Sequence, residues 1–68
     1  MTIDIELNGA PHKISAGQSL DDLVRSLDLA GKALAVAVNR HVVPRQAWSQ
    51  RVLRPADRID IVRAIGGG

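Results

Sequence analysis

Apolar and polar residues alternate at the start of the chain, in the stretch TIDIEL at residues 2–7. A period of two is typical of a strand with one buried face. The pair Asn8-Gly9 follows, and both residues tolerate the positive φ that a tight hairpin turn requires at its central positions. We therefore predict a strand over residues 2–7, a hairpin turn, and a second strand over residues 11–14. Pro11 favours the edge of the sheet for this second strand, where a missing N–H donor costs little.

A helical period begins at residue 19, in the stretch SLDDLVRSLDLAG. Its aliphatic residues recur at the spacing of one helix face, as Leu20, Leu23, Val24 and Leu27. Ser19 is placed to cap the first turn, and Asp22 completes the spacing of a capping box. Gly31 predicts the end of this helix, because glycine readily adopts the left-handed conformation that closes helices.

The second half of the chain contains further apolar segments that predict strands: ALAVAVN (33–39), Val42 with Val43, and RIDIVRAI (58–65). Between them, the stretch PRQAWSQ predicts a single helical turn that begins at Pro44. The stretch RPAD predicts a tight turn with Pro55 at its favoured second position. Val52 and Leu53 are expected to pack into the core just before that turn.

The predicted order of elements is two strands, a helix, and then two or three further strands. A single amphipathic helix can cover only one face of a sheet. The sequence therefore predicts an α+β fold of the β-grasp, or ubiquitin-like, type, with a mixed four- to five-stranded sheet and one main helix on one face. We expect one domain over residues 1–65 and a flexible glycine tail over residues 66–68.

Composition narrows the class of protein. The chain has 68 residues, no cysteine and a single aromatic residue, so its core must be aliphatic, without disulfides or thiolate metal sites. The N-terminal stretch resembles no signal peptide and no segment reaches the length of a membrane span, which predicts a cytoplasmic protein without membrane contact. Six arginines lie after residue 33, which indicates an acidic partner. Nucleic acid is disfavoured, because no aromatic residues accompany these arginines.

The predicted sheet leaves one face uncovered. If the isoleucines of the last strand face the helix, Val62 and Ala64 point outward, and Ala35 and Ala37 join them from the third strand. Small apolar residues are unusual on a solvent-facing sheet, so we interpret this face as a docking surface. The arginines expected around it are Arg40, Arg58 and Arg63. The alternative is that alanine is merely tolerated there.

No side chain in the sequence offers independent chemistry. The serines lack a neighbouring base, His12 and His41 have no spaced companion, and Asp21 and Asp22 point to different parts of the helix surface. An enzyme acting alone is therefore not expected. The closing glycines leave the terminal carboxylate as the candidate reactive group, because residues without Cβ fit a narrow slot in an activating partner. A frayed end or an expression remnant is the alternative reading of the same glycines.

The order of short motifs resembles the ThiS family, the sulfur carriers of thiamine thiazole biosynthesis. The matching residues are Ala37–Asn39, Val43-Pro44-Arg45, Trp48, the turn ending at Asp57, residues 59–62 and the closing glycines. The stretch AGQSLDDLVRSLDL is also similar to the segment leading into that family's helix. One departure is Ala56, because the family commonly has glycine at this position of the turn. The likeness covers nearly the whole chain and implies a β-grasp fold.

The resemblance also implies a reaction cycle. An E1-like adenylating enzyme (ThiF-type) would use ATP and magnesium to adenylate the Gly68 carboxylate, so no cofactor would bind this chain. Sulfur from cysteine, supplied through a desulfurase, would convert the carboxylate into a thiocarboxylate. A thiazole synthase (ThiG-type) would then take the sulfur. Gly66 and Gly67 would thread the tail into the partner, while Val62, Ala64, Arg63, Arg58, Ala35 and Ala37 would dock it.

Other functions fit the same sequence. The small subunit of molybdopterin synthase would share the fold, tail and chemistry but serve a different acceptor. A protein modifier would end in an isopeptide bond from Gly68 to a lysine. A passive β-grasp binding module would leave the tail unmodified.

Overall fold

The computed structural model describes residues 1–63. The predicted site residues Ala64, Gly66, Gly67 and Gly68, and the end of the last predicted strand, lie outside the described residues. The elements within them are β1 (Thr2–Leu7), β2 (Ala10–Ser15), α1 (Leu20–Ser26), β3 (Leu34–Val38), β4 (His41–Val42), the 3-10 helix η1 (Arg45–Gln50) and β5 (Arg58–Arg63).

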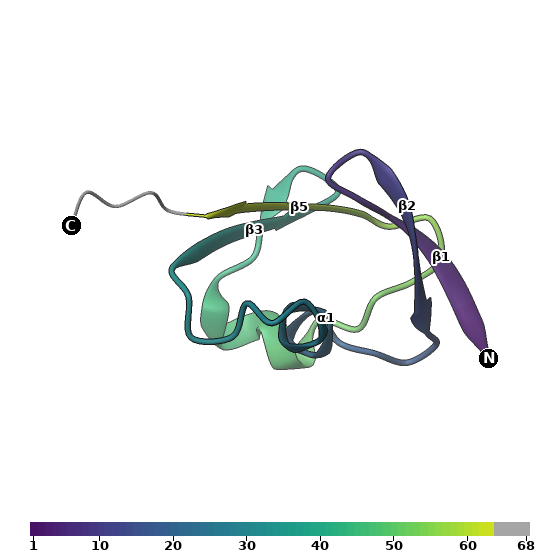
Figure 1. Cartoon of the computed structure of the whole chain (residues 1–68), viewed down its shortest axis with the longest axis horizontal. Helices are drawn as coiled ribbons and strands as arrows, with labels where there is room; N and C mark the ends of the chain where they lie inside the picture. Colours follow the sequence, from purple (N-terminus) through teal and green to yellow (C-terminus); the bar gives the residue numbers. More distant parts are fainter. Residues whose placement is uncertain (64–68) are drawn as a thin grey trace.

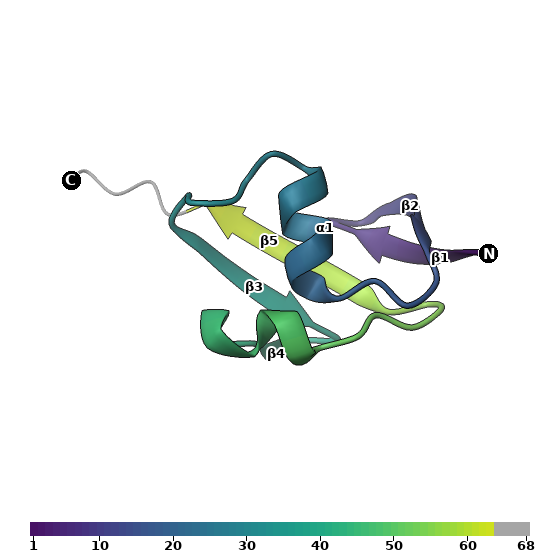
Figure 2. The ribbon, with the colours of Figure 1, turned by 90° about the horizontal axis from the view of Figure 1, so that it is seen from below.

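The strands form one mixed sheet in the order β2-β1-β5-β3-β4. Strands β1 and β5 are parallel, whereas the other neighbouring pairs are antiparallel. Helix α1 lies across one face of this sheet, with η1 beside it (Figures 1 and 2). The α+β arrangement predicted from the sequence is confirmed, with five strands in the sheet.

The first hairpin forms as its turn residues predict. Asn8 and Gly9 have φ of 50° and 83°, which places both central positions in the left-handed region. The side-chain oxygen of Asn8 also accepts a hydrogen bond of 2.8 Å from the backbone N–H of Ile61, so the turn is fastened to β5. Strand β2 lies at the edge of the sheet, where Pro11 was expected to place it.

Helix α1 begins as predicted but ends earlier. Ser19 and Asp22 form a reciprocal capping box, with hydrogen bonds of 3.0 and 3.1 Å between side chain and backbone. The helix ends at Ser26, so the stop predicted at Gly31 is wrong. Asp28 adopts a φ of 60°, and its N–H and that of the next residue donate to carbonyls of the last helical turn. These bonds close the helix before Gly31 is reached.

Three predictions in the segment after β3 need correction. Strand β4 covers residues 41–42, because a two-residue turn brings the chain back one residue earlier than expected. The helical turn is the 3-10 helix η1, and it begins after Pro44, whose backbone is extended. Val52 is 47% exposed, whereas Leu53 is buried. A backbone bridge between Val52 and Ser19 sets this alternation and directs the Val52 side chain outward.

The core lies between α1, η1 and the inner face of the sheet. Its most deeply buried side chains are Leu20, Leu23, Val24, Val36 and Ile59. Trp48 closes the η1 side of this core, and its indole N–H donates a hydrogen bond of 2.8 Å to the backbone carbonyl of Val43. The guanidinium of Arg45 lies 4.9 Å from the centre of the same ring. The tryptophan therefore has the packing role that a lone buried aromatic residue favours.

Candidate functional site

The sheet face opposite α1 carries a group of exposed apolar side chains. Strand pairing sets Ala35 opposite Val62 and Ala37 opposite Val42, and directly paired residues share a face. Val42 is 75% exposed and Val62 is 63% exposed. We call these four residues, Ala35, Ala37, Val42 and Val62, the apolar strip. The structure thus brings together three residues that the sequence predicted for a docking surface.

Val42 is the member of this strip that the sequence analysis missed. It lies in β4, which returns along β3 after the two-residue turn at Asn39 and Arg40. The sequence carries a signal for this turn, because asparagine is common at the first central position of a hairpin turn. Counting back from that turn sets Val42 opposite Ala37, on the face away from the helix.

Arg58 lies on the same outer face, but carboxylates hold its guanidinium. Its Nε is 3.4 Å from an oxygen of Asp60 and 3.6 Å from an oxygen of Glu6. All three side chains are about one-third to one-half exposed, so each ion pair contributes little to stability. The arginine that we expected beside the docking surface is therefore engaged by two carboxylates, whose charges outnumber its own.

Arg63 occupies a different side of the sheet. It pairs with Leu34, and alternation along β5 places it on the face that carries Ile59 and Ile61. Arg63 therefore does not join Arg58 on the outer face. The strand is nevertheless well anchored up to this point, because Ile59 is fully buried and every residue from Ile59 to Arg63 pairs with β3.

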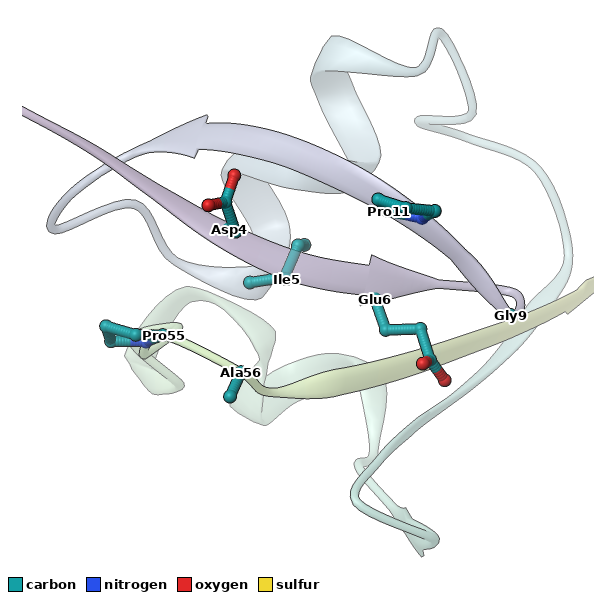
Figure 3. A pocket seen from close by; sticks show the side chains of 7 residues that line it. All are labelled: Asp4, Ile5, Glu6, Gly9, Pro11, Pro55 and Ala56. Carbon is teal, nitrogen blue, oxygen red and sulfur yellow. The ribbon is translucent and has the colours of Figure 1, made fainter.

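A shallow groove crosses the outer face of β1, between β2 and the turn that precedes β5 (Figure 3). Pro11 stands on one side of the groove, and Pro55 and Ala56 stand on the other. The carboxylates of Asp4 and Glu6 project from β1 toward different neighbours, Lys13 at 3.6 Å and Arg58 at 3.6 Å. These two carboxylates therefore do not form an acid–base pair.

The histidines and the aspartates of α1 are also not grouped into one site. His12 lies in β2 and His41 in β4, at opposite edges of the sheet. Asp21 forms an ion pair of 3.0 Å with Arg25. The backbone N–H of Ser19, and then its hydroxyl, hold the pKa of Asp22 below its usual value of 3.8. Among residues 1–63, no group of three or more histidine, aspartate or glutamate side chains is placed to hold a metal ion.

The described part of the chain also contains no helix that is both long and apolar enough to cross a membrane.

What the folded region offers is a rigid sheet, with an apolar strip close to the point where residues 64–68 begin. A partner that binds the strip would be in reach of that segment, since Val62 is only six residues before Gly68.

Comparison with known proteins is consistent with this arrangement. Residues 5–68 match the model of the ThiS family. The chain is 32% identical over 66 residues to the sulfur carrier protein ThiS of Escherichia coli, an alignment that covers 97% of this chain and 100% of that protein. It is also 42% identical over 64 residues to a thiazole synthase of Magnetococcus marinus. That alignment covers 94% of this chain but only 20% of the synthase, so the chain spans about a fifth of that relative's length.

A solved structure shares the fold. The thiamine biosynthesis protein ThiS from Geobacter metallireducens superposes with a TM-score of 0.83 and 22% sequence identity. The superposition covers 97% of this chain and all of the other. The β-grasp architecture is therefore that of a known protein structure.

Proposed function

Because the chain belongs to the ThiS family, we propose that it is a sulfur carrier of thiamine biosynthesis and that the Gly68 carboxyl group carries the sulfur. The observation that carries this proposal is the extent of the family match, which runs from residue 5 to residue 68 and includes the closing glycines. The end-to-end similarity to the sulfur carrier of Escherichia coli supports it independently. In this role the chain is a co-substrate of partner enzymes.

The chemistry follows from the low reactivity of a carboxylate. At neutral pH the terminal carboxyl is ionised and is a poor electrophile. Attack of its oxygen on the α-phosphorus of ATP, in the active site of an E1-like enzyme, releases pyrophosphate and forms an acyl-adenylate. The persulfide that a desulfurase forms from cysteine then attacks the carbonyl carbon, AMP leaves, and an acyl disulfide results. A second thiol cleaves its S–S bond, forming a new disulfide and releasing the thiocarboxylate. ATP and magnesium belong to the partner in this scheme.

The glycines suit this step for a steric reason. Three residues without Cβ can extend by up to about 10 Å along a slot that admits little more than backbone. Gly66 and Gly67 would occupy the slot, and Gly68 would present its carboxyl group at the end.

The apolar strip supplies the contact surface in this proposal. Val62 and Val42 expose enough aliphatic surface to form the centre of an interface, while Ala35 and Ala37 allow close approach. Arg58 shares the outer face with this strip, whereas Arg63 lies on the opposite face and is not part of the surface. A thiazole synthase is the favoured sulfur acceptor, because the Magnetococcus marinus synthase includes a region similar to this chain.

An activation assay tests the proposal. With an E1-like enzyme and ATP, the full chain should release pyrophosphate, and deletion of Gly68 should abolish release while the thermal melting curve stays unchanged. Val62→Asp should raise the KM for the carrier about tenfold without changing kcat, because it charges the centre of the docking surface. Thr2→Asp is the matched control, since it adds the same charge to an exposed position of another strand. Equal activity with and without Gly68 would refute the proposal.

A further inference from the structure

Two turns meet at the end of the sheet where β3 finishes and β5 begins (Figure 2). One is the β3–β4 turn at Asn39 and Arg40, and the other is the turn Arg54–Asp57. We call residues 39–41 and 54–57 the two-turn surface. It lies at the opposite end of β5 from Arg63, and therefore away from the point where the glycine segment begins.

The two turns are fastened to each other. The side-chain amide of Asn39 donates a hydrogen bond of 3.0 Å to Asp57, and its oxygen accepts one of 3.0 Å from the backbone N–H of Arg58. The second oxygen of Asp57 accepts a hydrogen bond of 2.8 Å from the backbone N–H of Arg54. Asp57 is 7% exposed, so the carboxylate that joins the two turns is buried. Side chains carried by either turn are therefore presented from one rigid frame.

Arg40 occupies a backbone position that does not favour it. Its φ is 71°, and asparagine followed by glycine is the preferred pair in such a two-residue hairpin turn. A residue with a Cβ incurs a steric cost in this region. Strained positions of this kind persist at functional sites, where the side chain contributes something other than stability. Within residues 1–63, Arg40 forms neither an ion pair nor a side-chain hydrogen bond that could offset this cost.

The charge of the two-turn surface is unbalanced. Arg54 is exposed and, among the described residues, its side chain also forms no ion pair. The carboxylate of Asp57 is already engaged, because Arg51 lies 3.5 Å from it in addition to the two hydrogen bonds. The surface therefore carries two arginine side chains whose charges are not compensated by a neighbouring carboxylate.

We infer that the two-turn surface is a second protein-binding site, at which Arg40 and Arg54 pair with carboxylates of an acidic partner segment. The inference goes beyond sulfur transfer and does not depend on it. Guanidinium groups bind carboxylates through paired hydrogen bonds, which gives such a contact both strength and orientation. Nucleic acid fits less well, because the only Phe, Tyr or Trp of the chain is the buried Trp48, which leaves His41 as the single exposed ring on this surface.

A titration followed by NMR tests this inference. The probe is an acetylated hexaglutamate peptide, with hexaglutamine and a single-stranded oligothymidine as comparisons. We expect hexaglutamate to shift the backbone amides of residues 39–41, 54 and 56–58, and this effect should be lost at high salt. Arg40→Gly and Arg54→Gln should each weaken binding about threefold, the size expected for one exposed ion pair. Lys13→Gln and Arg25→Gln remove a positive charge elsewhere and should leave binding unchanged.

Thermal melting separates the effect of a substitution on binding from its effect on folding stability. Arg40→Gly should raise Tm by roughly 4 °C, because glycine relieves the strain of the turn. Weaker binding by a more stable variant would show that the arginine serves recognition. The inference is overturned if hexaglutamate shifts no amides, if the shifts spread over all basic residues, or if the control variants lose as much affinity. A stronger response to oligothymidine would assign the surface to nucleic acid and would overturn it as well.

Discussion

At the scale of single residues, the turn before β5 contains a residue whose side chain is unfavourable for its own backbone conformation. The backbone N–H of Asp57 donates a hydrogen bond of 3.1 Å to the carbonyl of Arg54, and Pro55 occupies the second position, as predicted. Ala56 occupies the third position with a φ of 68°. This combination is a type II turn, in which the third residue is usually glycine. Ala56 is also the residue at which this turn departs from the ThiS pattern.

Ala56→Gly should therefore stabilise the protein. Relief of the left-handed strain outweighs the extra freedom that glycine has in the unfolded chain, with a net gain of about 0.5–1 kcal/mol in the free energy of unfolding. Urea unfolding followed by the fluorescence of Trp48 measures the change. Ala16→Gly is the matched control, because Ala16 is also exposed but is not among the residues with positive φ, and it should lose stability. Destabilisation by both substitutions would contradict the assignment of strain to Ala56.

At the scale of elements, the start of α1 could be predicted from sequence and its end could not. Ser19 and Asp22 act within one helical turn, so their spacing alone contains the information. At the end of the helix, Asp28 adopts the left-handed conformation and the next residue, Leu29, packs against the core. Tertiary packing creates such a contact, and no local sequence motif predicts it. Val42, by contrast, could have been placed from sequence, because the hairpin signal at Asn39 sets it opposite Ala37.

The capping box makes a prediction about pH. The folded pKa of Asp22 lies below the unfolded value near 3.8, chiefly because its carboxylate accepts the backbone N–H of Ser19. The unfolded chain therefore binds the proton more readily than the folded chain. The stabilisation is fully present above the unfolded pKa and is lost as the pH falls through the folded pKa. The stability difference between the wild type and Asp22→Asn should shrink on acidification from pH 6 to pH 2. Urea titrations across this range measure it, and a difference independent of pH would disprove the mechanism.

At the scale of the whole molecule, the sheet carries two candidate binding surfaces. The sheet presents the apolar strip near the end of β5 and the two-turn surface at the beginning of β5. Within residues 1–63, neither surface contains three or more histidine, aspartate or glutamate side chains placed to hold a metal ion. Periodicity predicted the outer face correctly at Ala35, Ala37 and Val62, and the same alternation along β5 places Arg63 on the opposite face, away from the docking surface where it was expected. The proposed chemistry therefore rests on Gly68, with the folded region serving for recognition.

The mass of the carboxyl-terminal residue tests this account most directly. A chain that ends at Gly68 is incubated with its activating enzyme, ATP, cysteine and a desulfurase, and intact-mass and fragment spectra are recorded. The account predicts that one oxygen is replaced by sulfur, and that fragments place the change on Gly68. Omission of ATP should prevent the exchange, because the carboxylate is then not activated. An unchanged mass with all components present, or sulfur located on any other residue, would contradict the account.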